Sequence, residues 1–274
     1  MIEYFREMFS YSFMVRAAII GLSVSICSAI VGVNLVQKKF SMIGHALSQI
    51  SFAALALALC FHLNPLSVSL PVTILAAYFL LRIKYNSGIN ADARLALLST
   101  LSIAIGVLFI SMSTGINTDI CNYLFGSLLA ADGAEMLFSI VLVIVVLLIY
   151  AIYYQKILLI TSDEIFARAA AVKVEFFNAL LAFLTAILIV MGIRTLGTLL
   201  ISTLLVFPAM TALTIARSYK RVIIISLSIA ILAFVIGLCL SYSYALPTGA
   251  GITLVNASFF AIAYVWKKLT GSRA

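Results

Sequence analysis

Long stretches without a charged residue are the feature of this chain that most limits its fold. The stretches between charged residues have the bounds 17–37, 40–81, 95–118, 136–155, 176–193, 195–216 and 222–266. Because one bilayer crossing takes about 20 apolar residues, each stretch predicts at least one transmembrane helix. The chain is 65% apolar and 9% charged, with a mean hydropathy of +1.23, and this balance excludes a soluble domain of 274 residues.

Two of these stretches are about twice as long as one crossing requires. They contain the turn signals His62-Leu63-Asn64-Pro65 and Pro247-Thr248-Gly249, where each is expected to divide. We therefore expect an all-α, polytopic membrane protein of eight or nine transmembrane helices that forms one membrane domain over residues 1–274. The stretch 120–131 is too short to cross and predicts a re-entrant helix. Residues 1–16 mix charges with aromatic rings and predict an interfacial segment.

Lysine and arginine gather in alternate loops, which predicts the orientation of the chain in the membrane. The basic loops lie at 38–39, 82–94, 156–173 and 217–221, followed by the tail at 267–273. The loops between them carry no lysine or arginine near His62, at 119–132 and at 244–251. We expect the N-terminus outside and the C-terminus in the cytoplasm. The net charge of +8 then reflects membrane topology and not nucleic-acid binding.

The segment Ser41-Met42-Ile43-Gly44-His45-Ala46-Leu47-Ser48-Gln49 places two polar side chains inside an apolar stretch. His45 and Gln49 are four residues apart and share one face of a helix. Polar groups are costly inside a bilayer, so this pair is a candidate ligand set or gate. In the alternative interpretation His45 hydrogen-bonds Ser41 or a neighbouring span, and Gln49 bridges two helices.

The segment 161–175 predicts a short amphipathic helix between two spans, on the cytoplasmic side. Ser162 is the expected N-cap, with Asp163 and Glu164 in the first turn. The segment is either a solvated connector or a docking helix for a cytoplasmic partner. Asn34, Asn178 and Asn256 are expected to form hydrogen bonds between helices.

Two kinds of signal are missing from the sequence. No G-x-x-x-x-G-K-[ST] motif occurs, and no charged residue lies in the middle of a span. Carriers coupled to protons or sodium usually need a titratable group at membrane depth. We therefore expect another subunit to supply the energy, and we do not expect this chain to be an enzyme.

Several motifs, taken in order, resemble the membrane subunit of the bacterial metal-ion ABC permease family, which serves zinc, manganese and iron uptake. Residues 41–49 resemble the family's S-h-h-G-D-[AG]-L-[SA]-H, and 124–129 resemble its L-F-G-x-h-L. Residues 163–172 resemble its D-x-x-x-A-x-x-x-G-V, with Ala171 in place of glycine. The later matches are Gly197-x-x-Leu200, Val206-Phe207-Pro208-Ala209, Ser241 and Pro247-Thr248-Gly249.

The resemblance implies a multi-pass permease of the bacterial cell membrane. Two copies would form a translocation path at their interface, two cytoplasmic ATPases would drive it, and an extracytoplasmic metal-binding lipoprotein would deliver the ion. Residues 161–175 would be the coupling helix, with Asp163, Glu164, Ala167 and Arg168 as the residues that couple it to the ATPase. A divalent metal ion would be the substrate, with no permanently bound cofactor.

The resemblance also gives a role to the polar segment of the second span. The family places metal-handling Asp and His side chains at the positions of His45 and Gln49, and Ser41 and Ser48 flank them. Neutral imidazole suits Zn²⁺, whereas an amide oxygen is a weaker ligand than carboxylate. We expect zinc first and manganese second as the ion. An importer of a metal chelate, a stand-alone channel and a secondary carrier remain the alternatives.

Overall fold

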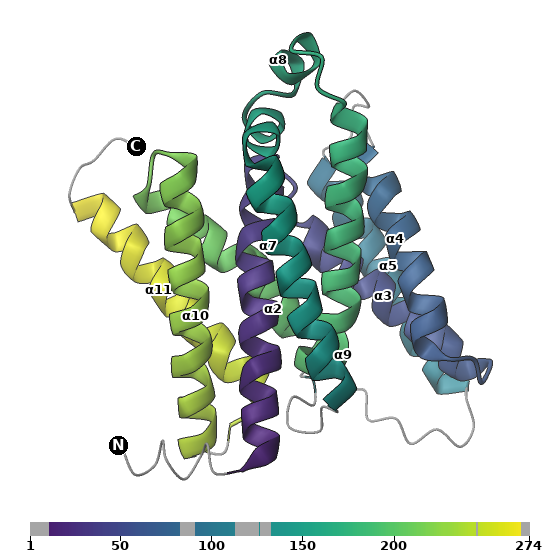
Figure 1. Cartoon of the computed structure of the whole chain (residues 1–274). Coiled ribbons are helices and arrows are strands. Elements are labelled where there is room, and N and C mark those ends of the chain that lie inside the picture. Colours follow the sequence, from purple (N-terminus) through teal and green to yellow (C-terminus); the bar gives the residue numbers. More distant parts are fainter. Residues whose placement is uncertain (1–10, 83–90, 113–125, 127–132, 245, 270–274) are drawn as a thin grey trace.

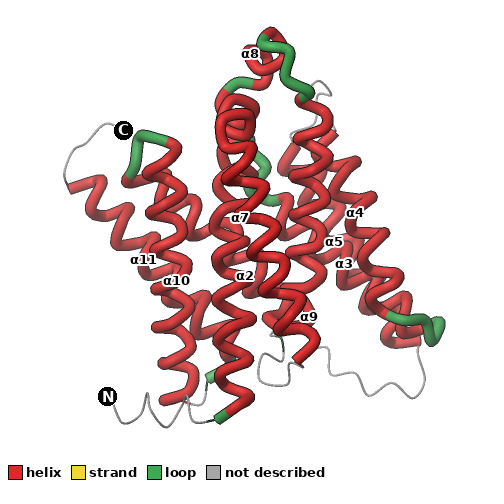
Figure 2. The backbone as a smooth tube through the Cα atoms, viewed as in Figure 1, coloured by secondary structure: helices red, strands yellow, loops and turns green. Residues whose placement is uncertain are grey.

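The described residues of the chain form a bundle of helices that run roughly along one axis (Figure 1). The computed structural model describes residues 11–82, 91–112, 126, 133–244 and 246–269. Every regular element in this part of the chain is a helix (Figure 2), which confirms the all-α prediction. The helices are α2 (Ser12–Gln37), α3 (Ile43–Cys60), α4 (Pro65–Arg82), α5 (Ala91–Met112), α7 (Gly133–Ser162), α8 (Glu164–Ala169), α9 (Val174–Ile215), α10 (Tyr219–Tyr244) and α11 (Thr248–Leu269).

Seven of the described helices are long and apolar enough to cross a membrane, namely α2, α3, α5, α7, α9, α10 and α11. The apolar part of α4 is shorter and covers Pro65–Leu80. Many large apolar side chains on α5, α7 and α11 are exposed. Exposed apolar surface of this extent is what a lipid-facing helix presents to hydrocarbon chains.

Both turn signals in the long uncharged stretches lie where a helix ends, as predicted. The first divides α3 from α4, and the second divides α10 from α11. His62 follows α3 with a φ of 54°, and its amide donates to the Leu59 carbonyl oxygen at 3.1 Å. The Leu63 amide donates to the Ala58 carbonyl oxygen at 2.8 Å, which completes a Schellman motif. Pro65 then begins α4, because a helix start needs no proline N–H.

Helix α9 is broken at Gly197 and reverses direction there. A straight helix of 42 residues would be about 63 Å long, roughly twice the hydrocarbon thickness of a bilayer. Gly197 has φ 84° and ψ 164°, a conformation that only glycine adopts easily. A Cβ on Gly192 would lie 2.4 Å from Cδ1 of Ile201, so residues on the two sides of the break touch.

The position of this break differs slightly from the sequence prediction. The uncharged stretches divide at Arg194, whereas the backbone turns at Gly197, three residues later. The charge marks the polar end of the span, but the turn needs the residue without a Cβ. Arg194 remains in the last turn of the first half of α9.

Helix α9 is the central element of the bundle, because it packs against α2, α3, α4, α10 and α11. Its side chains supply most of the large residues that are fully buried, among them Leu188, Ile193 and Leu200. Glycines bring the neighbouring backbones close: a Cβ on Gly32 of α2 would lie 2.0 Å from the Leu205 carbonyl oxygen. Small residues at such contacts are typical of helix packing in membranes.

Two predicted segments fall partly or wholly outside the described residues. Helix α2 begins at Ser12 and includes Arg16, so only the end of the expected interfacial segment 1–16 is described, and it is helical. Of the expected re-entrant segment 120–131, only Gly126 is described. The division into one membrane domain over 1–274 stays a prediction.

Candidate functional site

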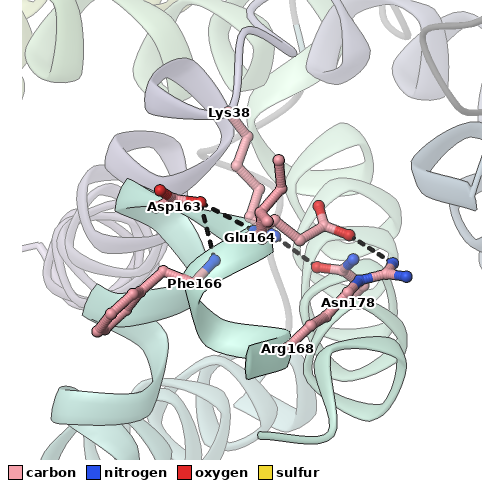
Figure 3. Close-up of polar contacts among 7 residues, drawn as sticks. Lys38, Asp163, Glu164, Phe166, Arg168 and Asn178 are labelled. Atoms are coloured by element: carbon pink, nitrogen blue, oxygen red, sulfur yellow. Dashed lines mark hydrogen bonds and ion pairs between the residues drawn. The ribbon is translucent and has the colours of Figure 1, made fainter. Parts of the chain in front are cut away.

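Helix α8 projects beyond one end of the bundle, between α7 and α9 (Figure 1). Its N-cap is Asp163, whose Oδ1 accepts hydrogen bonds from the amides of Ile165 at 2.9 Å and Phe166 at 3.0 Å (Figure 3). Arg168 and Glu164 form an ion pair at 2.8 Å, one turn apart. The acid lies at the N-terminal end of the helix and the base at its C-terminal end, as the helix dipole favours.

These contacts correct two details of the sequence prediction. The cap is Asp163 and not Ser162, because Ser162 is the last residue of α7. The predicted helix 161–175 was too long, since α8 covers only Glu164–Ala169 and the ends of that segment belong to α7 and α9. The capping carboxylate and the turn after Ala169 confine it to six residues.

Helix α8 ends in a Schellman motif that places Ala171 in the left-handed region, with φ 57°. The Val172 amide donates to the Ala167 carbonyl oxygen at 3.0 Å, and the Ala171 amide donates to the Arg168 carbonyl oxygen at 3.1 Å. This conformation is strained for alanine and free for glycine. It gives a physical reason for the glycine in the D-x-x-x-A-x-x-x-G-V pattern, from which this chain departs.

The exposed surface of α8 is apolar at its first turn. Ile165 is 82% exposed and Phe166 is 60% exposed, whereas Ala167 is completely buried. Sequence reasoning selected Asp163, Glu164, Ala167 and Arg168 and missed the two exposed residues. Their signal was present, because two large apolar residues stand directly after an acidic helix cap in a polar connector.

The end of α7, the short helix α8 and the start of α9 form a hairpin, whose two arms are the end of α7 and the start of α9. A lysine at the end of α2 lies beside these arms. The Lys38 ammonium donates a hydrogen bond to Oδ1 of Asn178 in α9 (Figure 3). Burial lowers the pKa of Lys38 below its ordinary value, and the nearby carboxylate of Glu164 opposes that shift. The predicted interhelical hydrogen bond of Asn178 is therefore confirmed.

Asn34 lies one helical turn before Lys38 on α2 and is fully buried. Its amide nitrogen donates to the Ile30 carbonyl oxygen at 2.9 Å and to the Tyr150 hydroxyl of α7. Its amide oxygen accepts from Thr161 at 2.9 Å and from Tyr219 at 2.7 Å. All hydrogen-bonding positions of the carboxamide are thus used, which confirms the predicted bridging role of Asn34.

The polar segment of the second span begins just before α3. Ser41 lies in the preceding turn, and His45 is partly exposed in the first turn of the helix. Ser48 is buried and its hydroxyl donates to the His45 carbonyl oxygen at 2.7 Å. Gln49 is 6% exposed, and its Oε1 atom is buried without a hydrogen-bond partner.

Within the described part of the chain, the His45 ring also forms no hydrogen bond to Ser41 or to a neighbouring span. The purely structural interpretation of the pair expected a bond to His45 and a bridge from Gln49. A buried, unpaired carboxamide oxygen carries an energetic cost, and such atoms call for an explanation. This is the unexplained polar group nearest to His45 along the helix.

The contacts of α3 show on which side the pair lies. Gly44 faces α9, where a Cβ would lie 2.9 Å from Cδ1 of Leu205. A Cβ built on Gly106 of α5 would lie 2.7 Å from Cε1 of Phe52, so Phe52 lies on the side of α3 that faces α5. On a helical projection His45 and Gln49 share the side of Phe52. The pair therefore lies on the face turned toward α5 and away from the central helix.

Metal-binding capacity in a single copy is limited. Among the described residues, no group of three His, Cys, Asp or Glu side chains is close enough to hold a metal ion. A metal site built on His45 and Gln49 therefore needs further ligands in addition to these two side chains. A second copy of the chain could supply them across a two-fold axis.

The opposite end of the bundle carries an ion pair between two helices. Arg194 Nη2 of α9 lies 2.8 Å from Glu135 Oε1 of α7, and both side chains are partly exposed.

Asn256, the third asparagine predicted to form a hydrogen bond between helices, forms none to another helix in the described part of the chain. It donates only to the Ile252 carbonyl oxygen of its own helix at 3.1 Å. Its Oδ1 atom is buried without a partner.

A bundle of apolar helices, seven of them long enough to cross a membrane, with a short capped helix beyond one end, defines a polytopic membrane protein. Residues 10–267 match the ABC 3 transport family, and the chain belongs to that family. It is a membrane permease subunit of the bacterial metal-ion ABC transporters, as the sequence motifs predicted.

Relatives of known name cover almost the whole chain. The manganese import system permease protein ScaB of Streptococcus gordonii is 29% identical over 262 residues, which are 96% of this chain and 94% of that protein. The high-affinity zinc uptake system membrane protein ZnuB of Haemophilus influenzae is 25% identical over 252 residues, which are 92% of this chain and 97% of that protein.

Solved structures share the fold. The structure of PsaBC from Streptococcus pneumoniae in complex with Fab aligns with a TM-score of 0.84 and 30% identity, and it covers 96% of this chain and 95% of that one. An inward-facing transporter of the metal-chelate type aligns with a TM-score of 0.72 at 19% identity. It covers 92% of this chain and 85% of the other, and it shows the fold alone.

Proposed function

We propose that this chain carries a divalent transition-metal ion, zinc first, along a path lined by His45 and Gln49 of α3, with Ser41 and Ser48 beside them. The observation that supports this proposal is the buried, unpaired Oε1 of Gln49, one turn from an imidazole without a hydrogen bond. An atom of this kind is satisfied when a cation or its water occupies the path. Across an interface between two copies, the partly exposed His45 is the side chain that the second copy could reach, whereas Gln49 is buried on the side of α5.

The ligand types favour zinc over manganese. Imidazole nitrogen suits Zn²⁺, whereas Mn²⁺ prefers carboxylate and other hard oxygen ligands. This chain has no carboxylate in the polar segment of α3, and an uncharged path holds the ion weakly enough to release it. Manganese is the second candidate, because ScaB and several further relatives are named as manganese transporters. A metal chelate is the third, on the fold shared with the chelate-type transporter.

We further propose nine membrane crossings, with the N-terminus outside and the C-terminus in the cytoplasm. Counting α4 and the two halves of α9 separately gives nine segments. Helix α2 starts at the end of the bundle opposite α8, and α11 ends toward the end of α8 (Figure 1). Most of the described basic residues lie near the α8 end, which the positive-inside rule assigns to the cytoplasm.

In this arrangement α8 is the coupling helix on which a cytoplasmic ABC ATPase docks. Ile165 and Phe166 supply the apolar contact, Asp163 fixes the helix start, and the Glu164–Arg168 ion pair borders the contact. Ala167 holds the helix against the bundle without touching the partner. A metal-binding lipoprotein would deliver the ion at the opposite, extracytoplasmic end.

The test is metal uptake by the complex of this permease with its ATPase, reconstituted in vesicles and supplied with the metal-binding lipoprotein loaded with Zn²⁺, Mn²⁺ or Fe²⁺. We expect Zn²⁺ to be taken up best, and His45→Ala to abolish uptake while membrane insertion and ATPase assembly stay intact. His62→Asn is the matched control, because His62 lies in an exposed turn whose left-handed backbone asparagine tolerates. Normal uptake by the His45→Ala complex would overturn the proposed path.

A further inference from the structure

The last two turns of α2 hold both arms of the coupling hairpin. Thr161, at the end of α7, donates to the buried Oδ1 of Asn34 at 2.9 Å. Asn178, at the start of α9, accepts from the ammonium group of Lys38 (Figure 3). The arm that enters α8 and the arm that leaves it are therefore bound by two residues one helical turn apart on the same helix.

The same turns of α2 lead directly into the polar segment of α3. Gln37 ends α2 and Ile43 begins α3, so five residues separate the two helices. The connection is tight: the Lys39 amide donates to the Val36 carbonyl oxygen at 3.0 Å, and the Phe40 amide donates to the Leu35 carbonyl oxygen at 2.9 Å. A short, hydrogen-bonded connection of this kind passes a displacement of α2 to the start of α3.

Burial and charge make these contacts suitable for transmission. Asn34 is fully buried and satisfies all its hydrogen bonds with partners from α2, α7 and α10, so it moves only with them. Lys38 is a half-buried cation that donates a hydrogen bond to Asn178 of α9, and the carboxylate of Glu164 in α8 acts on its charge. Breaking this bond leaves a partly desolvated charge without its acceptor, so the arms and α2 are expected to shift together.

We propose that Asn34 and Lys38 are the positioning residues that transmit movement of the coupling helix α8 to α3. They contact neither the ion nor the ATPase. They bind α2 to Thr161 and Asn178, and the turn at 38–42 passes the shift to the first turn of α3, where His45 lies. This inference rests on the proposed function for the identity of the transported ion. The transmission of movement from α8 through α2 to α3 concerns only this chain.

The experiment measures metal transported per ATP hydrolysed by the reconstituted complex. Thr161→Val and Asn178→Leu each remove one hydrogen-bonding group from one arm. We expect transport per ATP to fall on the order of tenfold in each variant, the usual size of a coupling effect, while ATP hydrolysis continues. Asn178→Asp keeps an oxygen acceptor for Lys38 and is expected to retain the wild-type ratio.

Ser226→Ala is the matched control. The Ser226 hydroxyl of α10 donates to the Ala29 carbonyl oxygen of α2 at 3.2 Å, so this variant removes a buried contact of α2 that touches neither arm. The control is expected to keep the wild-type ratio. The inference is overturned if the two arm variants transport with the wild-type ratio, or if Ser226→Ala loses as much as they do.

A second measurement separates this inference from the proposed function. Spin labels at positions 169 in α8 and 63 beyond the end of α3 report their distance with and without ATP, in a chain whose four native cysteines are replaced. We expect an ATP-dependent change in the wild-type complex and its loss in Thr161→Val and Asn178→Leu. If the wild-type complex moves no metal, the importer proposal fails. If the distance change persists in both variants, the transmission by α2 fails.

Discussion

Gly126 lies directly against the backbone at Gly197. A Cβ built on Gly126 would lie 2.3 Å from the carbonyl carbon of Leu196 and 2.5 Å from the amide nitrogen of Gly197. Both glycines have positive φ angles, 76° and 84°. Two motifs that are 71 residues apart in the sequence thus meet where α9 reverses, and position 126 has no room for a side chain.

The first prediction follows from this contact. Gly126→Ala should lower the free energy of unfolding by about 3 kcal/mol, because a left-handed alanine costs about 1–2 kcal/mol and overpacking adds a similar amount. Gly133→Ala is the control, since nothing lies within 4 Å of its added Cβ, and it should change stability by less than about 0.5 kcal/mol. Thermal unfolding of the purified permease in detergent measures both variants, and equal melting temperatures would refute the contact.

The second prediction concerns the strained end of α8. Ala171→Gly should raise the free energy of unfolding by about 0.5–1 kcal/mol, because relief of the left-handed strain exceeds the entropic cost of glycine. Ala170→Gly, one residue earlier at φ −78°, should instead lower it by up to about 1 kcal/mol. Chemical unfolding of the two variants in detergent compares the signs. A loss of stability in Ala171→Gly would contradict the argument.

The third prediction separates stability from transport at Gln49. Gln49→Leu removes a buried oxygen that has no partner, so stability should rise by about 1 kcal/mol while metal uptake falls. Asn256→Val removes another unpaired buried oxygen, in α11 and away from the polar segment of α3, and should leave uptake unchanged. Measurements of unfolding and of metal uptake on both variants test this prediction. Unimpaired uptake by Gln49→Leu would exclude Gln49 from the path.

The fourth prediction concerns docking of the ATPase. Replacement of Ile165 and Phe166 by serine should weaken the association of the ATPase with the permease by about 30-fold, as expected for two apolar residues at the centre of an interface. The stability of the permease should change by less than about 0.5 kcal/mol, because both side chains are exposed. Titration of labelled ATPase against the permease in detergent measures the affinity.

Leu63→Ser provides the comparison for the docking variant. Leu63 is 52% exposed in the turn between α3 and α4, away from α8 (Figure 2). The Leu63→Ser permease should bind the ATPase with the same affinity as the unchanged permease. Equal losses in both variants would show that exposed apolar surface in general, and not the first turn of α8, governs the association.

Much of the fold could be predicted from local sequence. Charge-free stretches located the helices, and turn signals divided α3 from α4 and α10 from α11, because both depend on transfer energies and backbone preferences of short segments. The bounds of α8 were less accurate. Ser162, Asp163 and Ala171 could each have capped or continued a helix, and the choice depends on how α7 and α9 enter the hairpin.

The candidate site was only partly predictable. His45 and Gln49 were identified from spacing and resemblance, and their role as path residues stays a proposal. Ile165 and Phe166 stand out in the sequence as apolar residues in a polar connector, but the burial of Ala167 beside them was not visible there. A six-residue helix has too few turns for periodicity to show which side faces the bundle.

The sequence by itself determined the all-helical class, the approximate span positions and the family, because these follow from residues close together in the chain and from motif order. The tertiary structure alone decided that α9 reverses at Gly197 against Gly126, and that Asn34 and Lys38 bind both arms of the coupling hairpin. It also left Gln49 with an unpaired oxygen. The physical reason is that these contacts join residues far apart in sequence, and such pairs depend on how the helices pack.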